Sequence, residues 1–75
     1  MKANVKYQST SGNQEETLEL KTTKNNKIVI ECRYASALAG QAKGTKIEIN
    51  GKPAVIDGVG KRFGDGWCYV YFQYC

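Results

Sequence analysis

The residues that most often carry protein chemistry are sparse in this chain, and histidine is missing from all 75 positions. Without imidazole, Ser-His-Asp and Cys-His nucleophiles are excluded, as is every zinc site that uses histidine. Three cysteines remain, Cys32, Cys68 and Cys75, with no C-x-x-C pair among them. Three thiolates need a fourth ligand to close a metal site. The sequence therefore predicts no metal and no cofactor.

The segment Gly58-Val59-Gly60-Lys61-Arg62 is the nearest approach to a phosphate-binding loop. Such a loop has a glycine five residues before its Gly-Lys pair and Ser or Thr after the lysine. Here those positions hold Val55 and Arg62. A bulge or sharp bend between two strands is the better interpretation.

Acid–base catalysis would need two carboxylates that converge in an apolar cleft. The seven carboxylates are Glu15, Glu16, Glu19, Glu31, Glu48, Asp57 and Asp65. Most of them fall at outward positions of predicted strands or in turns, where water is their natural environment. The sequence therefore predicts that the protein is not an enzyme.

The strongest candidate for function is an aromatic run at residues 67–75, which holds five of the eight aromatic residues. In a strand, alternate side chains point to opposite faces. One face carries Trp67, Tyr69 and Tyr71; the other carries Cys68, Val70, Phe72 and Tyr74. If the second face fills the core, the first forms an exposed stripe of about 13 Å. The alternative is that both faces are covered, one by the core and one by other elements.

Alternating apolar and polar residues predict the elements that would position this stripe. Strands are expected at 4–9, 15–22, 28–34, 45–49, 52–59 and 67–75. Asn50-Gly51 indicates a type I′ hairpin. The Ala-rich segment at 36–43 predicts one short helix, with Ser36 as its N-cap and Gly44 as its stop. Cys32 is expected to face inward beside Ile30, as a small buried hydrophobe.

Residues 1–75 are therefore expected to form one mainly β domain. The preferred fold is a small antiparallel barrel or curled sheet, SH3-like or OB-like, with five to six short strands and the short helix. An antiparallel sheet packed by that helix is the second arrangement.

The formal net charge is +4, and the eleven Lys and Arg residues are spread along the chain without a polybasic run. No apolar stretch approaches the ~20 residues that span a bilayer, and the first residues show no signal-peptide pattern. An odd number of cysteines without an export signal favours reduced thiols. We therefore expect a cytoplasmic protein, in the host cytoplasm if it is viral, without a membrane partner.

Two functions fit these features. The first is a non-catalytic protein-binding module that uses Trp67, Tyr69, Tyr71, Lys61 and Arg62. Such a compact chain is similar to many small phage products, some of which inhibit host defence proteins by occupying a surface. The alternative is binding of single-stranded or duplex nucleic acid, by stacking on aromatic rings flanked by cations. Its candidate residues are Lys46, Lys52, Lys61, Arg62, Trp67 and Tyr69.

A homodimer is a further expectation, because a second apolar face can be buried across a two-fold axis. A nucleotide pocket closed by such a dimer is the third, lower-ranked alternative.

Overall fold

The computed structural model describes all 75 residues and consists of strands joined by turns and loops. The strands are β1 (Lys2–Ser9), β2 (Gly12–Thr22), β3 (Ile28–Arg33), β4 (Lys46–Ile49), β5 (Lys52–Val59) and β6 (Trp67–Tyr74). Every expected strand is present, with ends that differ by a few residues. The prediction of a mainly β fold is confirmed.

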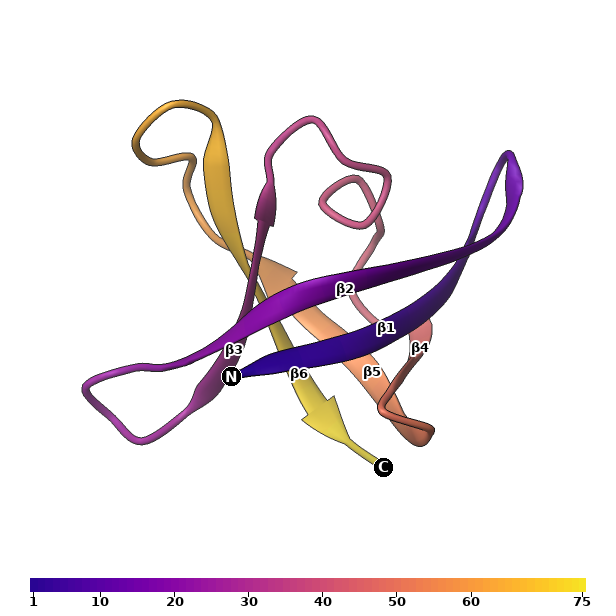
Figure 1. The fold of residues 1–75 in the computed structure, drawn as a ribbon, viewed down its shortest axis with the longest axis horizontal. Coiled ribbons are helices and arrows are strands. Elements are labelled where there is room, and N and C mark those ends of the chain that lie inside the picture. The colour runs from indigo at the N-terminus through magenta and orange to yellow at the C-terminus, as the bar shows by residue number, and fades with distance from the viewer.

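The six strands close into a barrel in the order β1-β2-β3-β6-β5-β4, and β4 pairs back onto β1. Every pairing is antiparallel. Two three-stranded meanders, β1-β2-β3 and β4-β5-β6, thus form the wall, and Figure 1 shows β1 and β2 crossing over β5 and β6. The predicted small antiparallel barrel is confirmed, and closure leaves no open sheet edge.

Local sequence explains the tight connections. Asn50 and Gly51 have φ values of 52° and 82°, the positive pair that a type I′ turn requires. The β5–β6 register shifts between Ile56 and Gly58, which is the bulge that the glycines near residue 58 indicated.

The interior is a cluster of thirteen buried residues contributed by every strand. Inward alternation on β6 is confirmed for Cys68 and Val70, both fully buried. Cys32 is also fully buried, as expected. Tyr74, which shares the inward face of β6, is 47% exposed because it lies at the open end of the barrel.

The predicted helix at 36–43 is wrong, because residues 34–44 form a series of turns. Isolated i→i+3 bonds occur, such as Gly40 N–H to Ala37 O at 3.2 Å. Gly40 weakens any helix here, and so short a segment cannot offset the cost of nucleation. Ser36 Oγ still accepts a bond from Ala39 N–H at 3.4 Å, so the capping contact forms without a helix.

The loop at residues 34–44 crosses one end of the barrel and contributes a side chain to the core. In the closed order, β3 and β4 lie on opposite sides of the barrel, so the chain between them must cross one end. Leu38 from the middle of the loop is fully buried in the interior cluster. The loop therefore plugs the barrel with one leucine.

Candidate binding surface

The outward face of β6 carries the three rings that sequence analysis singled out. Trp67 and Tyr69 are half-buried, and Tyr71 is 37% exposed. Phe63, from the β5–β6 loop, joins them and is also 37% exposed. We call these four side chains, Phe63, Trp67, Tyr69 and Tyr71, the aromatic face.

The rings of the aromatic face are held by neighbours. Phe63 packs on Tyr69 with ring centroids 4.7 Å apart and an interplanar angle of 39°. A Cβ atom placed on Gly60 would lie 3.2 Å from Cε2 and Oη of Tyr71, so the Tyr71 ring rests on the Gly60 backbone. Such contacts reduce the rotamer entropy that a partner would have to remove on binding.

The loop that supplies Phe63 is itself anchored. Phe63 and Trp67 exchange two backbone hydrogen bonds, of 2.7 and 3.0 Å. The tip turns through Gly64 and Gly66, whose φ values of 55° and 95° suit glycine. Tyr34 N–H donates to Gly66 O at 2.7 Å, which joins this loop to the end of β3. The β5–β6 loop and the loop that follows β3 lie at the same end of the barrel in Figure 1.

Cationic groups border the aromatic face at that end. Arg33 is the register partner of Trp67, and its guanidinium carbon lies 4.3 Å from the centroid of the Trp67 ring system. This is a cation–π contact. Arg62 lines the same shallow depression as Arg33, together with Tyr34, Ser36 and Asp65. Neither arginine forms an ion pair, whereas Lys43 and Asp57 do, at 3.8 Å.

Strand β3 borders the other side of the aromatic face. Val29 lies opposite Tyr71 and points outward, yet it is only 1% exposed and does not belong to the interior cluster. A second, smaller buried site therefore lies outside the barrel wall. Glu31 lies opposite Tyr69 on one side and Glu19 on the other, so the Glu31 carboxylate adjoins the middle of the aromatic face.

Toward the end of β6, the surface hollows into a depression lined by four apolar residues, Ile28, Tyr71, Phe72 and Tyr74, and by six polar ones, Thr23, Asn25, Asn26, Lys27, Asp57 and Gln73. Ile28 is 40% exposed, although its position in the β3 alternation is an inward one. It lies where β3 begins, at the open end of the barrel, and so escapes the core. The surface beyond Tyr71 is therefore of mixed polarity.

The structure brings together Trp67, Tyr69, Tyr71 and Arg62 of the predicted protein-binding residues. Lys61 is exposed in the same loop, next to Arg62.

The nucleic-acid alternative also needed Lys46 and Lys52, which lie elsewhere. Lys46 is exposed on β4, and β5 separates that strand from β6. Lys52 Nζ lies 6.0 Å from the centroid of the Tyr74 ring, at the other end of β6. Tyr74 is about 23 Å from Trp67 along an extended strand. Lys46 and Lys52 therefore do not converge with Trp67 and Tyr69, whereas Lys61 and Arg62 lie in the loop that precedes β6.

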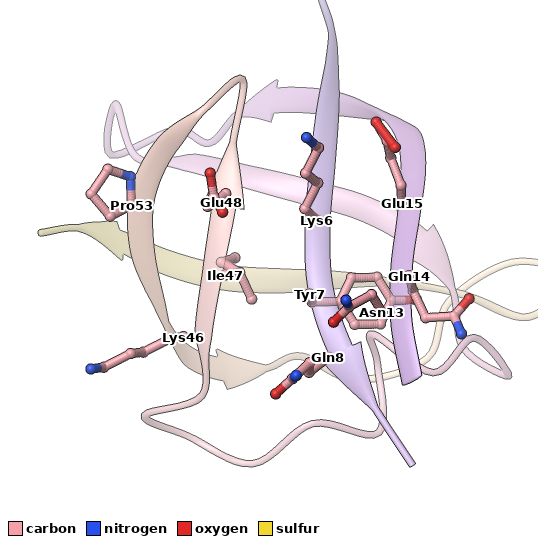
Figure 2. A pocket seen from close by; sticks show the side chains of 10 residues that line it. All are labelled: Lys6, Tyr7, Gln8, Asn13, Gln14, Glu15, Lys46, Ile47, Glu48 and Pro53. Atoms are coloured by element: carbon pink, nitrogen blue, oxygen red, sulfur yellow. The ribbon is translucent and has the colours of Figure 1, made fainter. Parts of the chain in front are cut away.

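The outward side of β1, β2 and β4 presents a different surface, which we call the charged face. Lys6 lies in register between Glu15 on β2 and Glu48 on β4. All three side chains are exposed, and Figure 2 shows Lys6 between the two carboxylates while Tyr7 and Ile47 point behind the sheet. These exposed charges are solvated by water, and each has an opposite charge in the neighbouring register position.

The barrel interior holds the ionisable groups with the most perturbed pKa values. Cys32 and Cys68 are register partners with Sγ atoms 3.9 Å apart, and burial raises the pKa of the Cys32 thiol to about 12. The Tyr7 hydroxyl donates a hydrogen bond to Glu16 Oε2, and burial raises the pKa of Tyr7 above its usual range. A thiol held in its protonated form is a poor nucleophile.

No three Cys, Asp or Glu residues form a group that could hold a metal ion.

Sequence reasoning missed Arg33, Phe63 and Val29 as parts of this surface. The alternation that places Ile30 and Cys32 inward also places Val29 and Arg33 on the outward side of β3, but nothing local indicated that β3 pairs with β6. Phe63 reaches the face through a loop, where alternation gives no information. Only the basic and aromatic residues close to β6 in sequence carried a usable signal.

Comparison of the chain with protein-family models, with curated proteins and with solved structures gave no match. The chain forms no helix with the length and apolarity needed to cross a membrane.

Proposed function

We propose that this protein is a non-catalytic binding module that docks a partner protein on its aromatic face. The observation that carries the proposal is the set of ordered, partly exposed rings on the outside of a closed barrel. Tyr and Trp are enriched at protein hot spots because each offers a large contact area at low entropic cost. An inhibitor of a host defence protein could act through such a face simply by occupying a surface.

Two features favour a protein over a nucleic acid. The Arg33 guanidinium carbon lies 4.3 Å from the centroid of the Trp67 ring system, so one side of that ring system is already covered. A base that stacked on that side would have to displace Arg33. In addition, Glu31 places a carboxylate beside Tyr69, where a polyanion would meet repulsion. A protein surface with mixed polarity meets neither obstacle.

The test is affinity capture from the organism that carries the gene, with variants matched between the two faces. Phe63→Ala and Tyr71→Ala each remove a ring that is 37% exposed. Lys6→Ala and Glu48→Ala change the charged face instead. If one ring is a hot spot, its loss weakens the captured complex by about 30-fold, or ~2 kcal/mol. The charged-face variants should retain the complex.

Circular dichroism must first show that each variant is folded, and nuclease treatment must leave the captured protein bound. Light scattering on the purified chain tests whether the partner is a second copy. Loss of capture by all four folded variants alike would contradict docking on the aromatic face.

Nucleic-acid binding is the second candidate, favoured by the two arginines beside Trp67. It predicts that affinity for an oligonucleotide falls linearly with salt on logarithmic axes. No binding to single-stranded DNA or RNA at low ionic strength would remove it.

A further inference from the structure

The depression at the end of β3 is lined by two arginines whose guanidinium groups have no carboxylate partner. Arg33 and Arg62 both line it, and neither has a carboxylate oxygen within ion-pair distance. Arg33 Nη1 approaches only the backbone oxygen of Asp65, at 3.4 Å. Most of the donors on these two planar groups therefore remain available to an outside acceptor.

The surrounding backbone fixes this arrangement before any partner arrives. Arg62 precedes the small hairpin closed by the paired hydrogen bonds between Phe63 and Trp67. Arg33 ends β3, is paired in register with Trp67, and rests over its ring system at 4.3 Å. Because Tyr34 is bonded to Gly66, the segments that carry the two arginines are tied to each other. Arg33 is therefore held against Trp67 before an anion binds, whereas Arg62 is exposed and is positioned through its backbone alone. An anion that binds here restricts the Arg62 side chain more than that of Arg33.

We propose that this corner receives a carboxylate side chain from an acidic segment of the partner protein, with an apolar neighbour of that side chain against the aromatic face. The inference rests on the proposed function and specifies the partner's chemistry. Arginine binds a carboxylate through paired, charge-assisted hydrogen bonds. The docked carboxylate would supply the negative partner that the two guanidinium groups do not have within the protein.

The charge distribution favours a single localised anion over a continuous polyanion. Glu31 lies on the outward surface of β3, and its neighbour Glu19 on β2 is already paired with the N-terminal ammonium at 2.9 Å. Asp65 lies in the depression itself. A nucleic-acid backbone leaving the arginine corner toward Tyr69 would run past Glu31, whereas one acidic side chain needs only the corner.

The experiment is a nitrogen-15 NMR titration of the full chain with defined probes. The acidic probe is the capped peptide Gln-Gln-Leu-Glu-Gln with one carboxylate, its neutral counterpart is Gln-Gln-Leu-Gln-Gln, and the third probe is a ten-nucleotide thymidine strand. We expect the acidic peptide to shift the Trp67 indole N–H and Arg33 Nε–H resonances, and the neutral peptide to bind at least about tenfold more weakly.

The matched variants remove equal charge from the two faces. Arg33→Gln with Arg62→Gln should weaken the acidic peptide about tenfold or more, whereas Lys6→Gln with Lys46→Gln should change it less than about twofold. Equal binding of the two peptides by the unaltered chain would overturn the inference, whatever the variants do. So would equal weakening by both double variants, or tighter binding of the thymidine strand at the same resonances.

The outcome is separable from that of the proposed function. If the Arg33→Gln, Arg62→Gln variant still captures a partner that Phe63→Ala and Tyr71→Ala lose, the acidic-segment inference fails while protein docking stands. If neither set of variants affects capture, docking on this face fails as well.

Discussion

The aromatic face and the charged face are both outward surfaces of the same barrel wall, yet they behave differently. On the charged face, Glu15, Lys6 and Glu48 form a row of exposed side chains without a direct ion pair. On the aromatic face, Arg33 packs against Trp67 and Phe63 packs against Tyr69, and both rings remain half-buried. Strand alternation makes the side chains of both faces point outward. Whether they stay exposed or become partly buried depends on whether they are charged or aromatic.

Val29 makes the contrast concrete. It is an outward residue at 1% exposure, while outward residues of β1 such as Lys6 and Gln8 are exposed. The barrel therefore has a principal interior and a smaller apolar layer on one side only. In a domain of this size, an outer layer adds buried area that the interior cannot supply.

The largest expected effect comes from placing a charge in that outer layer. Val29→Asp should destabilise the fold by about 2–4 kcal/mol, because it buries a carboxylate in place of an apolar side chain, with the exposed Lys21 as its cationic neighbour in register. Gln8→Asp, an outward substitution on β1, should cost less than about 0.5 kcal/mol. Urea unfolding of the two variants measures the difference. Similar stability for both would mean that the outer layer contributes nothing.

Removing a ring should have an intermediate effect. Tyr69→Ala loses a half-buried ring and its contact with Phe63, which we expect to lower the free energy of unfolding by about 1–3 kcal/mol. Lys6→Ala should stay within about 0.5 kcal/mol. Thermal unfolding by circular dichroism compares them, and an equal loss in both variants would remove the distinction between the faces.

The stability of the fold at alkaline pH tests the barrel interior, which lies behind both faces. The pKa of Cys32 is raised to about 12 in the folded state, so folding favours the protonated thiol. Its contribution to stability is complete below the unfolded pKa of about 8.5 and is lost as pH rises toward 12.

We therefore expect the urea midpoint to fall above about pH 9, and less steeply in Cys32→Ala. Cys75→Ala is the matched control, since that thiol is exposed. An unchanged slope in Cys32→Ala would mean that the buried thiol does not govern this loss.

The smallest expected effect concerns one contact of the aromatic face. Gly60→Ala brings a Cβ to 3.2 Å from the Tyr71 ring, which must shift by a few tenths of an ångström. We expect a cost below about 1 kcal/mol, with a clear change in the Tyr71 ring resonances. Gly40→Ala, whose nearest neighbour is the Ala37 carbonyl at 3.6 Å, should leave those resonances unchanged. Identical spectra for both variants would contradict the contact.

Sequence analysis was most successful where structure depends on neighbouring residues. Strand alternation placed Cys32, Cys68 and Val70 inward, and Asn50-Gly51 fixed a hairpin, because both signals act over a few residues. It failed at 36–43, where the need to cross the barrel end and bury Leu38 outweighed the helical preference of alanine. It also missed Arg33, whose proximity to Trp67 follows from the pairing of β3 with β6.

From its residues alone, the chain determined that one face of the last strand would carry Trp67, Tyr69 and Tyr71, since alternation is a property of the extended backbone. Tertiary structure alone decided what surrounds them. Barrel closure brings β3 beside β6, and the Phe63–Trp67 hairpin folds over their ends. Long-range pairing and loop geometry therefore turn an aromatic run into a supported surface with an arginine corner.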